Sequence, residues 1–428
     1  MTLRTVTATI TSPQRNHELL LLSASAAFIL IAWRALDAAA FALPVSSSRI
    51  VTQFLLSALF GHLALRAVAP RAAGQPYAIA VLLTAIGLAF VVRLAPAAAQ
   101  SQANWISLGV LLMAGAAWAA RDYPRLRAYK YTSALLAVLL LVATGLFGTT
   151  INGARLWFTV AGQTVQSTEL IKLFLVVFLA GYLADEASVL ASPRLRFGGR
   201  SYSALPYLLP LLATLFIAIA ALALLKDLGS IALLLLLTIG ALYVATGRLS
   251  FVVGGLLLLA STGVFGYFAF DHARVRIDVW LDPFATADSS GYQTVQSLYA
   301  IQAGGVTGEG LGLGQPDTIP AATTDYIFDS IAEELGLAGA LGVVLLYILL
   351  LFAGFRISLT MPDEYGRLLT AIISLLIATQ AAVIIAGNLR IIPTTGITLP
   401  FVSYGGSSLI VNFVLLGLVL GISNRVRD

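Results

Sequence analysis

Charged side chains stand beside or within long apolar stretches of this sequence, and these are the residues best suited to chemistry. Arg155 lies in a short polar turn, and Glu169 and Lys172 follow it at a spacing that puts both on one helix face. Asp227 separates two apolar runs. Ionisable groups in apolar surroundings cost free energy, so they suggest function. The structural alternatives are an ion pair inside a helix bundle for Glu169 and Lys172, and a turn residue for Asp227.

A second group of charges lies in and just after the segment 270–327. Arg274 and Arg276 open the segment, and carboxylates follow along it, at Asp278, Asp282, Asp288, Asp325, Glu333 and Glu334. Loop aspartates are usually only solvated, and the glutamate pair could cap a helix N-terminus, where the helix dipole favours carboxylates. The functional interpretation rests on the coincidence that so many charges fall in one half of the molecule.

Two runs of small residues are less specific. Residues 303–314 contain six glycines, which allow a tightly folded backbone to lie against a ligand. This run follows no strand, so it is neither a P-loop nor a dinucleotide-binding fingerprint. The run 403–408, with Ser403, Gly405 and Ser407, is not a Gly-x-Ser-x-Gly elbow and has no nearby histidine to act as a base. Small residues at a helix start are more typical of close helix packing.

The composition indicates that lipid surrounds most of this chain. Of 428 residues, 59% are hydrophobic and 11% are charged, and the mean hydropathy is +0.92. Soluble domains have about 25% charged and about 45–50% apolar residues, so a water-soluble enzyme, a disordered chain and a nucleic-acid binder are excluded. The chain contains no cysteine and three scattered histidines, which excludes disulfides and thiolate sites and gives no sign of a histidine metal cluster.

A spanning helix needs about 20 mostly apolar residues, and the hydropathy pattern predicts an all-α polytopic membrane protein with about twelve such helices. The first run begins near Leu19 and is followed by many others, so it predicts a spanning helix rather than a cleavable signal peptide. The predicted spans are 19–36, 50–70, 77–94, 103–120, 132–149, 167–183, 204–224, 229–247, 249–269, 328–355, 366–390 and 403–422.

The distribution of basic residues predicts the orientation. With the N-terminus in the cytoplasm, the inward-facing segments carry most of the Lys and Arg residues, in agreement with the positive-inside rule. We therefore expect both termini in the cytoplasm and the segment 270–327 outside. This segment contains no long apolar run, so we expect it to be non-helical, and long non-helical segments are usually functional.

Four stretches, taken in order, are similar to the SEDS family (shape, elongation, division and sporulation; RodA/FtsW type) of bacterial cell-wall synthesis. The stretches are 153–172, Asp227-Leu228-Gly229, Gly291-Tyr292-Gln293 through the glycine run to 336, and 393–408. The resemblance covers roughly 130–425. Five predicted spans precede the first stretch where the family commonly has three, so we expect residues 1–130 to include an extra helix pair and residues 131–428 to form the catalytic membrane core.

This resemblance implies a GT-C-like helical bundle and a peptidoglycan glycosyltransferase. Such an enzyme polymerises lipid II into β-1,4 glycan strands at the outer face of the bacterial cytoplasmic membrane and releases undecaprenyl diphosphate. The implied partner is a class B penicillin-binding protein, a transpeptidase that crosslinks the strands.

The family's reaction needs a carboxylate base and cations that stabilise the departing diphosphate. The family's catalytic aspartate precedes the tyrosine of Gly-Tyr-Gln by six positions, and this chain has Thr286 there. We expect Asp288 to take this role first and Asp282 second. The predicted substrate-binding residues are Arg155, Glu169, Lys172, Asp227, Arg274, Arg276, Gln293, Gln296, Ser297, Asp325, Glu333, Ser403, Gly405 and Ser407.

A divalent cation that bridges the diphosphate and a loop carboxylate would be Mg²⁺ or Mn²⁺, because the available ligands are oxygens. The sequence has no metal-ligand spacing, so this cofactor is an option rather than an expectation.

Two other functions fit some of these features. A flippase for lipid-linked precursors would also place charges in a multi-span bundle, but transporters often contain repeated halves, and no motif recurs here. A non-catalytic scaffold for a penicillin-binding protein would account for Thr286 at the position of the base. The clustering of charges on the external side favours the enzyme.

Overall fold

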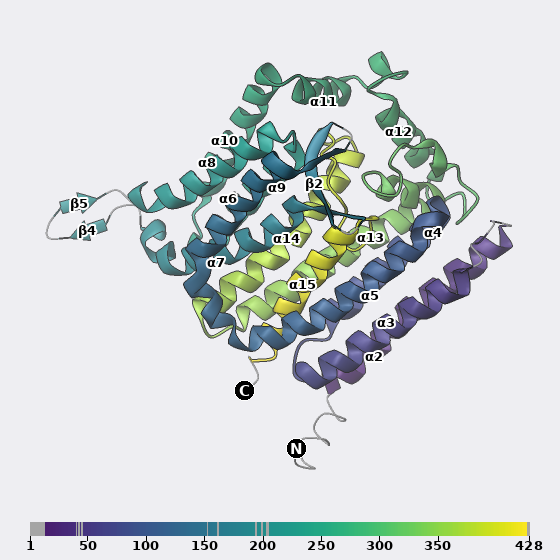
Figure 1. The fold of residues 1–428 in the computed structure, drawn as a ribbon, viewed down its shortest axis with the longest axis horizontal. Helices are drawn as coiled ribbons and strands as arrows, with labels where there is room; N and C mark the ends of the chain where they lie inside the picture. Colours follow the sequence, from purple (N-terminus) through teal and green to yellow (C-terminus); the bar gives the residue numbers. More distant parts are fainter. Residues whose placement is uncertain are drawn as a thin grey trace, which may run out of the picture. The chain divides into compact units, whose positions relative to one another are not determined.

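The computed structural model describes residues 13–39, 41, 43, 46–151, 153–160, 162–192, 195–197, 200–202 and 205–425. The chain forms two compact units. Unit 1 comprises Met1–Arg121, Val275–Gly354 and Gln380–Asp428, and unit 2 comprises Asp122–Arg274 and Phe355–Thr379. Figure 1 shows the order of the elements along the chain.

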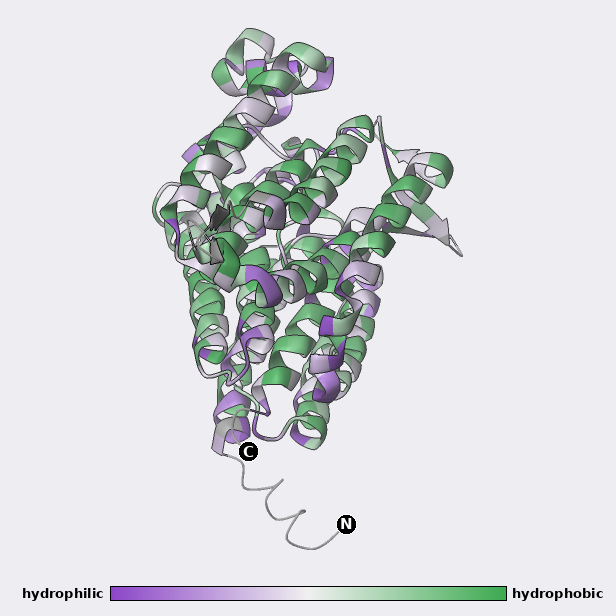
Figure 2. Cartoon of the chain, turned by 90° about the vertical axis from the view of Figure 1, so that its left-hand side faces the viewer, coloured by the Kyte–Doolittle hydropathy of each residue, from purple (hydrophilic) through white to green (hydrophobic). Residues whose placement is uncertain are grey.

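The described residues form eleven continuous helical segments that are long and apolar enough to cross a membrane. One of them, Pro96–Phe147, has 52 residues and contains α5 and α6 joined by the 3₁₀ segment η1. At about 1.5 Å per residue this segment exceeds the bilayer core of about 30 Å more than twofold, so it holds two spans. Each of the twelve predicted apolar runs therefore falls on a helix, and Figure 2 shows how strongly hydrophobic residues dominate these helices.

Unit 1 is built from N-terminal and C-terminal helices together. It contains α2 (Pro13–Ala38), α3 (Ser47–Val68), α4 (Gln75–Leu94), α5 (Pro96–Ala119), α12 (Tyr292–Gly304), α15 (Gly406–Ser423), most of α11 (Asp271–Leu281) and of α13 (Ile327–Leu359), the end of α14 (Glu364–Asn388), and the 3₁₀ turns η3 (Phe284–Thr286) and η4 (Pro316–Thr318). Helix α15 packs along α5, α2 packs on α4, and α3 packs on α5. A Cβ at Gly417 would lie 2.3 Å from the Met113 carbonyl oxygen, so glycine permits this close α5–α15 contact.

Unit 2 contains the remaining spans and two small sheets. Its elements are most of η1 (Ala120–Tyr129), α6 (Lys130–Phe147), β1 (Thr149–Ile151), β2 (Ala154–Val160), β3 (Gln163–Gln166), α7 (Ser167–Ala191), β4 (Leu195–Phe197), β5 (Arg200–Tyr202), η2 (Leu205–Leu208), α8 (Leu209–Leu224), α9 (Leu228–Thr246), α10 (Leu249–Ala269), the start of α11, the end of α13 and most of α14. Strands β1, β2 and β3 form an antiparallel sheet in which Trp157 faces Gln166. Helices α6, α7, α9 and α10 pack successively.

The expectation that the segment 270–327 is non-helical was wrong. Helices α11 and α12 and two 3₁₀ turns occupy much of it. Both helices are shorter than a span and mix polar with apolar residues, so a window that searches for continuous apolar runs does not detect them. Val295 and Ala300 of α12 are buried, whereas Tyr292 and Tyr299 are exposed.

The glycine run after α12 packs against a break in α13. At Gly336 the backbone has φ 66° and ψ −169°, a combination that only glycine adopts readily. The break leaves the carbonyl oxygens of Glu333 and Glu334 available, and they accept hydrogen bonds of 3.0 Å from the backbone N–H groups of Glu309 and Gly310. The run therefore lies against α13 itself in this structure.

Buried side chains hold the same run in place. The Glu333 carboxylate accepts a hydrogen bond of 2.7 Å from the Gln315 N–H, and the Glu334 carboxylate accepts one of 3.0 Å from the Gly312 N–H. Arg93 of α4 donates to Glu334 at 3.1 Å and to the Gly314 carbonyl oxygen at 3.0 Å. The glutamate pair thus lies beyond the first turn of α13 and anchors a loop rather than capping a helix N-terminus.

We predict that Gly336→Ala destabilises the protein by about 1–3 kcal/mol, because the backbone conformation at this position is strained for any residue that carries a Cβ. It would also lie 2.3 Å from the Gly308 nitrogen. Thermal unfolding of the detergent-solubilised chain measures the effect. The control is Gly342→Ala on the same helix, where a Cβ meets no atom within 4 Å; an equal loss in both variants would contradict this explanation.

Candidate functional site

A polar cavity of about 130 Å³ lies within unit 1, where α11, α12 and the end of α14 meet the loop before α15. Three predicted site residues line it: Arg276, Gln293 and Asp325. The remaining polar lining residues are Ser290, Thr294, Tyr326, Asn388, Thr394 and Thr395. The fold therefore brings together residues that are more than 100 positions apart in the sequence.

Arg276 is held by backbone carbonyl groups. Its Nη1 donates to the carbonyl oxygens of Thr394 at 3.2 Å and Thr395 at 2.9 Å. The same loop is tied to the end of α11 by Trp280 and Arg390, each of which donates to the other's carbonyl oxygen, at 3.1 Å and 2.8 Å. These bonds fix the guanidinium at the cavity wall.

Gly396 separates the two opposite charges of the cavity. A Cβ at this position would lie 3.5 Å from Arg276 Nη2 and 3.6 Å from Asp325 Oδ2. The backbone at Gly396 has φ +69°, a left-handed conformation that favours glycine. Any larger residue would place its side chain between the guanidinium and the carboxylate.

Asp325 is a half-buried carboxylate whose pKa is raised above its ordinary value. Burial is the largest cause, and it is opposed by a hydrogen bond with Thr324 and by the positive charge of Arg276. The Asp325 carbonyl oxygen accepts a hydrogen bond of 3.1 Å from the Asn388 side chain. A carboxylate with a raised pKa is a stronger proton acceptor than an ordinary aspartate.

The loop before α15 holds the backbone beside Asp325. Ser403 Oγ donates to the Thr324 carbonyl oxygen at 2.6 Å and accepts from the Leu399 N–H at 2.8 Å. The Tyr404 N–H donates to the Thr323 carbonyl oxygen at 2.8 Å. Ser403 is buried, so in this structure it helps to position Asp325 by holding the backbone next to it.

The two carboxylates predicted as bases lie at the surface rather than on the cavity wall. Asp282 is exposed and accepts a hydrogen bond of 3.2 Å from the Ala285 N–H of η3. Asp288 is exposed two residues before Ser290 of the cavity. Thr286, at the family's aspartate position, has a buried hydroxyl that finds no hydrogen-bond partner in the described chain.

Other candidates in unit 1 serve packing in this structure. Ser297 of α12 is buried and donates to Asp329 Oδ2 of α13 at 2.9 Å. Gln296 is half-buried beside it, and Gly405 and Ser407 lie at the start of α15. Asp329 is a fully buried carboxylate that the sequence analysis did not single out. Asp329 lies in the first turn of α13, four residues after Asp325, and this closeness in sequence was the available signal.

Unit 2 holds a separate set of candidates. Lys172 Nζ lies 2.6 Å from Glu169 Oε2, and both are largely buried. Asp227 caps α9, because its carboxylate accepts from the Ser230 N–H at 2.9 Å and from the Ser230 hydroxyl at 2.7 Å. Lys172 and Ser230 line one small cavity of about 30 Å³.

The two remaining arginines among the predicted site residues contact residues that are close to them in the sequence. Arg155 is exposed on β2 and donates to the Gly145 carbonyl oxygen at 3.0 Å. Arg274 lies 3.7 Å from Asp271 and over the ring of Tyr267 at 5.8 Å.

In the part of the chain that the structure describes, no three acidic or histidine side chains come together to hold a metal ion. The cavity itself offers Asp325 as its one carboxylate among the lining residues. These residues do not form a complete protein site for Mg²⁺ or Mn²⁺, so we derive no step through a metal.

Comparisons with known proteins identify the relatives of this chain. Peptidoglycan glycosyltransferase RodA of Mycobacterium tuberculosis is 36% identical over 384 residues, which cover 86% of this chain and 82% of the relative. The RodA of Mycobacterium leprae is 35% identical over 98% of this chain and 93% of the relative. Stage V sporulation protein E of Bacillus subtilis is 35% identical over 68% of this chain and 77% of the relative.

Two solved structures are similar in fold. One, from work on the coordination of polymerisation and crosslinking by a peptidoglycan synthase complex, has a TM-score of 0.64 at 26% identity and covers 90% of this chain and 99% of its own. Thermus thermophilus rod shape determining protein RodA has a TM-score of 0.58 at 26% identity and covers 82% and 96%.

The family model of FtsW, RodA and SpoVE, described as cell cycle proteins, matches residues 74–428 and leaves α2 and α3 outside the match. The chain belongs to this family, the SEDS family that the sequence motifs predicted.

Proposed function

We propose that this chain is a peptidoglycan glycosyltransferase that polymerises lipid II at the outer face of the bacterial cytoplasmic membrane. Its relatives with this name support the activity. The observation that carries the proposal is the cavity in which Arg276, Asp325 and Gln293 meet, because a cation, a carboxylate and neutral hydrogen-bonding groups are what a sugar diphosphate requires.

The proposed reaction joins two lipid-linked disaccharides. The 4-hydroxyl oxygen of the acceptor attacks C1 of the donor and loses its proton to a carboxylate. The bond between C1 and the diphosphate oxygen breaks, and the departing undecaprenyl diphosphate keeps the electron pair. Attack from the opposite face inverts the α-linked donor to a β-1,4 product. A positioned base contributes about 10²–10⁴-fold to such a rate.

The structure supports Asp325 as the proton acceptor and Arg276 as the cation that stabilises the departing charge. Both side chains line the cavity, and the carbonyl groups of Thr394 and Thr395 hold Arg276 in place. Gln293, Thr294 and Asn388 would bind sugar hydroxyls. Asp288 and Asp282 remain predicted bases that could act at the rim, and the experiments below compare all three carboxylates.

Further predicted contacts to the substrate lie outside this cavity. They are Arg155, Glu169, Lys172, Asp227, Arg274, Gln296, Ser297, Glu333, Ser403, Gly405 and Ser407. We propose that Glu169 and Lys172 of α7 and Asp227 at the start of α9 contribute to binding the lipid-linked substrate, because these two helices line the same small cavity of unit 2. We propose a positioning role for Ser403, Ser297 and Glu333, because each one bonds to protein groups.

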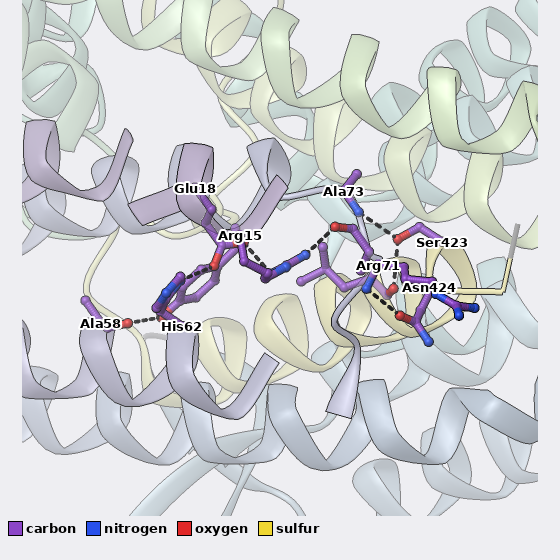
Figure 3. Close-up of polar contacts among 11 residues, drawn as sticks. Arg15, Glu18, Ala58, His62, Arg71, Ala73, Ser423 and Asn424 are labelled. Carbon is purple, nitrogen blue, oxygen red and sulfur yellow. Dashed lines mark hydrogen bonds and ion pairs between the residues drawn. The ribbon is translucent and has the colours of Figure 1, made fainter. Parts of the chain in front are cut away.

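We further propose that both termini lie in the cytoplasm and that a class B penicillin-binding protein crosslinks the product. Figure 3 shows that residues at the start of α2 and at the end of α15 both contact the loop between α3 and α4. Arg15 donates to the Ala72 carbonyl oxygen, and the neighbouring N–H groups of Arg71 and Ala73 donate to Asn424 at 2.9 Å and Ser423 at 3.2 Å. An even number of spans also puts both termini on the same side of the membrane.

We predict that Arg276→Gln lowers kcat/KM for lipid II polymerisation by about 10²–10³-fold, because it removes a fixed cation at the developing diphosphate charge. The assay uses the purified full chain with its penicillin-binding partner, and labelled products are sized on a gel. Arg125→Gln gives the comparison: this exposed arginine pairs with Asp122 at 3.3 Å and is not a predicted site residue, and we expect less than about a tenfold loss. A larger loss from Arg125→Gln would contradict this assignment.

We predict that Asp325→Asn lowers the rate of polymerisation by about 10²–10⁴-fold, the usual contribution of a base. Asparagine preserves the shape of the side chain and cannot accept the proton. Asp288→Asn and Asp282→Asn are measured in parallel. If Asp288→Asn abolishes polymer while Asp325→Asn retains it, the base is Asp288; if wild-type protein makes no polymer, the enzyme proposal is wrong.

The dependence of rate on pH tests the same assignment. Burial raises the pKa of Asp325 above the ordinary aspartate value of about 3.9. Its proton-accepting form is therefore lost as the pH falls through this raised value, and we expect the acid limb of kcat/KM above about pH 4. Because the positive charge of Arg276 lowers this pKa, the residual activity of Arg276→Gln should show its acid limb at higher pH. An acid limb that does not move would argue against Asp325.

A further inference from the structure

A second, larger cavity lies on the outer side of α3 and α5 in unit 1, away from the residues of the reaction cavity. Its volume is about 710 Å³. The lining residues come from the two helices alone, and they are Ser48, Arg49, Thr52, Gln53, Leu56, Ser57, Phe60, Ser107 and Leu111. Leu56, Phe60 and Leu111 are 60%, 47% and 53% exposed, so the cavity is a groove that opens sideways from these helices.

Polar side chains on the floor of the groove bond to one another. Gln53 donates to Ser107 at 3.0 Å and to Asn104 at 3.1 Å, and it accepts from Gln100 at 2.9 Å. Ser57 lies 2.9 Å from Ser107. Such a seam joins two helices in a bilayer, where polar groups need partners. The floor is therefore already satisfied, and Arg49 is left as the charged group of the lining.

The lining changes from polar to apolar along α3. Ser48, Arg49 and Thr52 lie in the first two turns, whereas Leu56 and Phe60 lie further along, opposite Leu111 of α5. From Arg49 to Phe60 the helix rises about 16 Å, which is half of the bilayer core of about 30 Å. A cation at the membrane interface followed by an apolar channel one leaflet deep matches the shape of one lipid molecule.

The charge of the groove selects the lipid headgroup. Arg49 is the single cation of the lining, and no lining residue is a carboxylate. Among the described residues Arg49 forms no ion pair, so its charge is available to a phosphate. One cation balances one phosphodiester rather than a diphosphate. The lack of a carboxylate in the lining gives the amine of a zwitterionic headgroup no partner.

We propose that the α3–α5 groove binds one anionic glycerophospholipid of the phosphatidylglycerol class. Its phosphate contacts Arg49, its glycerol region lies beside Thr52 and Gln53, and an acyl chain follows Leu56, Phe60 and Leu111. This site is independent of the proposed enzymatic activity, and it lies partly on α3, outside the region that matches the family model.

Native mass spectrometry of the purified, delipidated full chain tests the proposal by titration with phosphatidylglycerol, phosphatidylethanolamine and undecaprenyl diphosphate. We expect phosphatidylglycerol to bind most tightly. Arg49→Gln should weaken its binding about fivefold, the equivalent of about 1 kcal/mol for one basic side chain at a membrane surface. The charge-matched control is Arg356→Gln, an exposed arginine at the end of α13, which should not change it.

A second pair of variants tests the shape of the groove without changing charge. Leu111→Trp should fill the groove and reduce phosphatidylglycerol binding, whereas Leu112→Trp, next to it on α5 and outside the lining, should not. Both leucines are exposed, so neither change disturbs the core. Equal binding of phosphatidylethanolamine, unchanged binding in Arg49→Gln, or tighter binding of undecaprenyl diphosphate would each overturn the proposal.

Discussion

The hydrogen bonds from Arg276 to the carbonyl oxygens of Thr394 and Thr395 hold together the wall of the polar cavity in unit 1. They join α11, which begins the long segment after α10, to the loop that precedes α15. A guanidinium that satisfied its donors on water or on a carboxylate would not constrain this loop. Because two backbone carbonyl groups accept from it, the cation is fixed without being neutralised, and its charge still acts on Asp325. The same contact therefore builds the site and sets its electrostatics.

Hydropathy alone predicted the membrane spans, because a run of apolar residues in lipid has no alternative to a helix that satisfies its own backbone. The same reasoning failed between 270 and 327. Helices α11 and α12 are stabilised by tertiary contacts such as the mutual bonds of Trp280 and Arg390, which no local pattern reveals. The short sheet of β1, β2 and β3 was also unforeseen, since three strands of at most seven residues leave little periodicity to detect.

The candidate site, too, could be predicted from the sequence only in part. Residue type and motif order identified Arg276, Gln293 and Asp325, and the structure places them around one cavity. Sequence could not distinguish these from Ser403, Ser297 and Glu333, which carry the same polar chemistry but direct it to other protein atoms. Whether a polar group faces a ligand or a neighbouring backbone depends on the tertiary position of its partner. The glycines of 303–314 show the same limit, because their permissive backbone lies against the break at Gly336.

Thr286 stands at the position of the family's aspartate, and it does not line this cavity. A hydroxyl at this position does not accept a proton at neutral pH, so another group must do so if polymerisation follows the usual course. Asp288 is exposed and does not line the cavity. Asp325 is in the opposite situation, since burial disfavours its charge and the opposed guanidinium keeps the ionised form within reach. Its raised pKa makes Asp325 a stronger proton acceptor than an ordinary aspartate, and we therefore propose the cavity wall rather than the exposed turn as the place of the reaction.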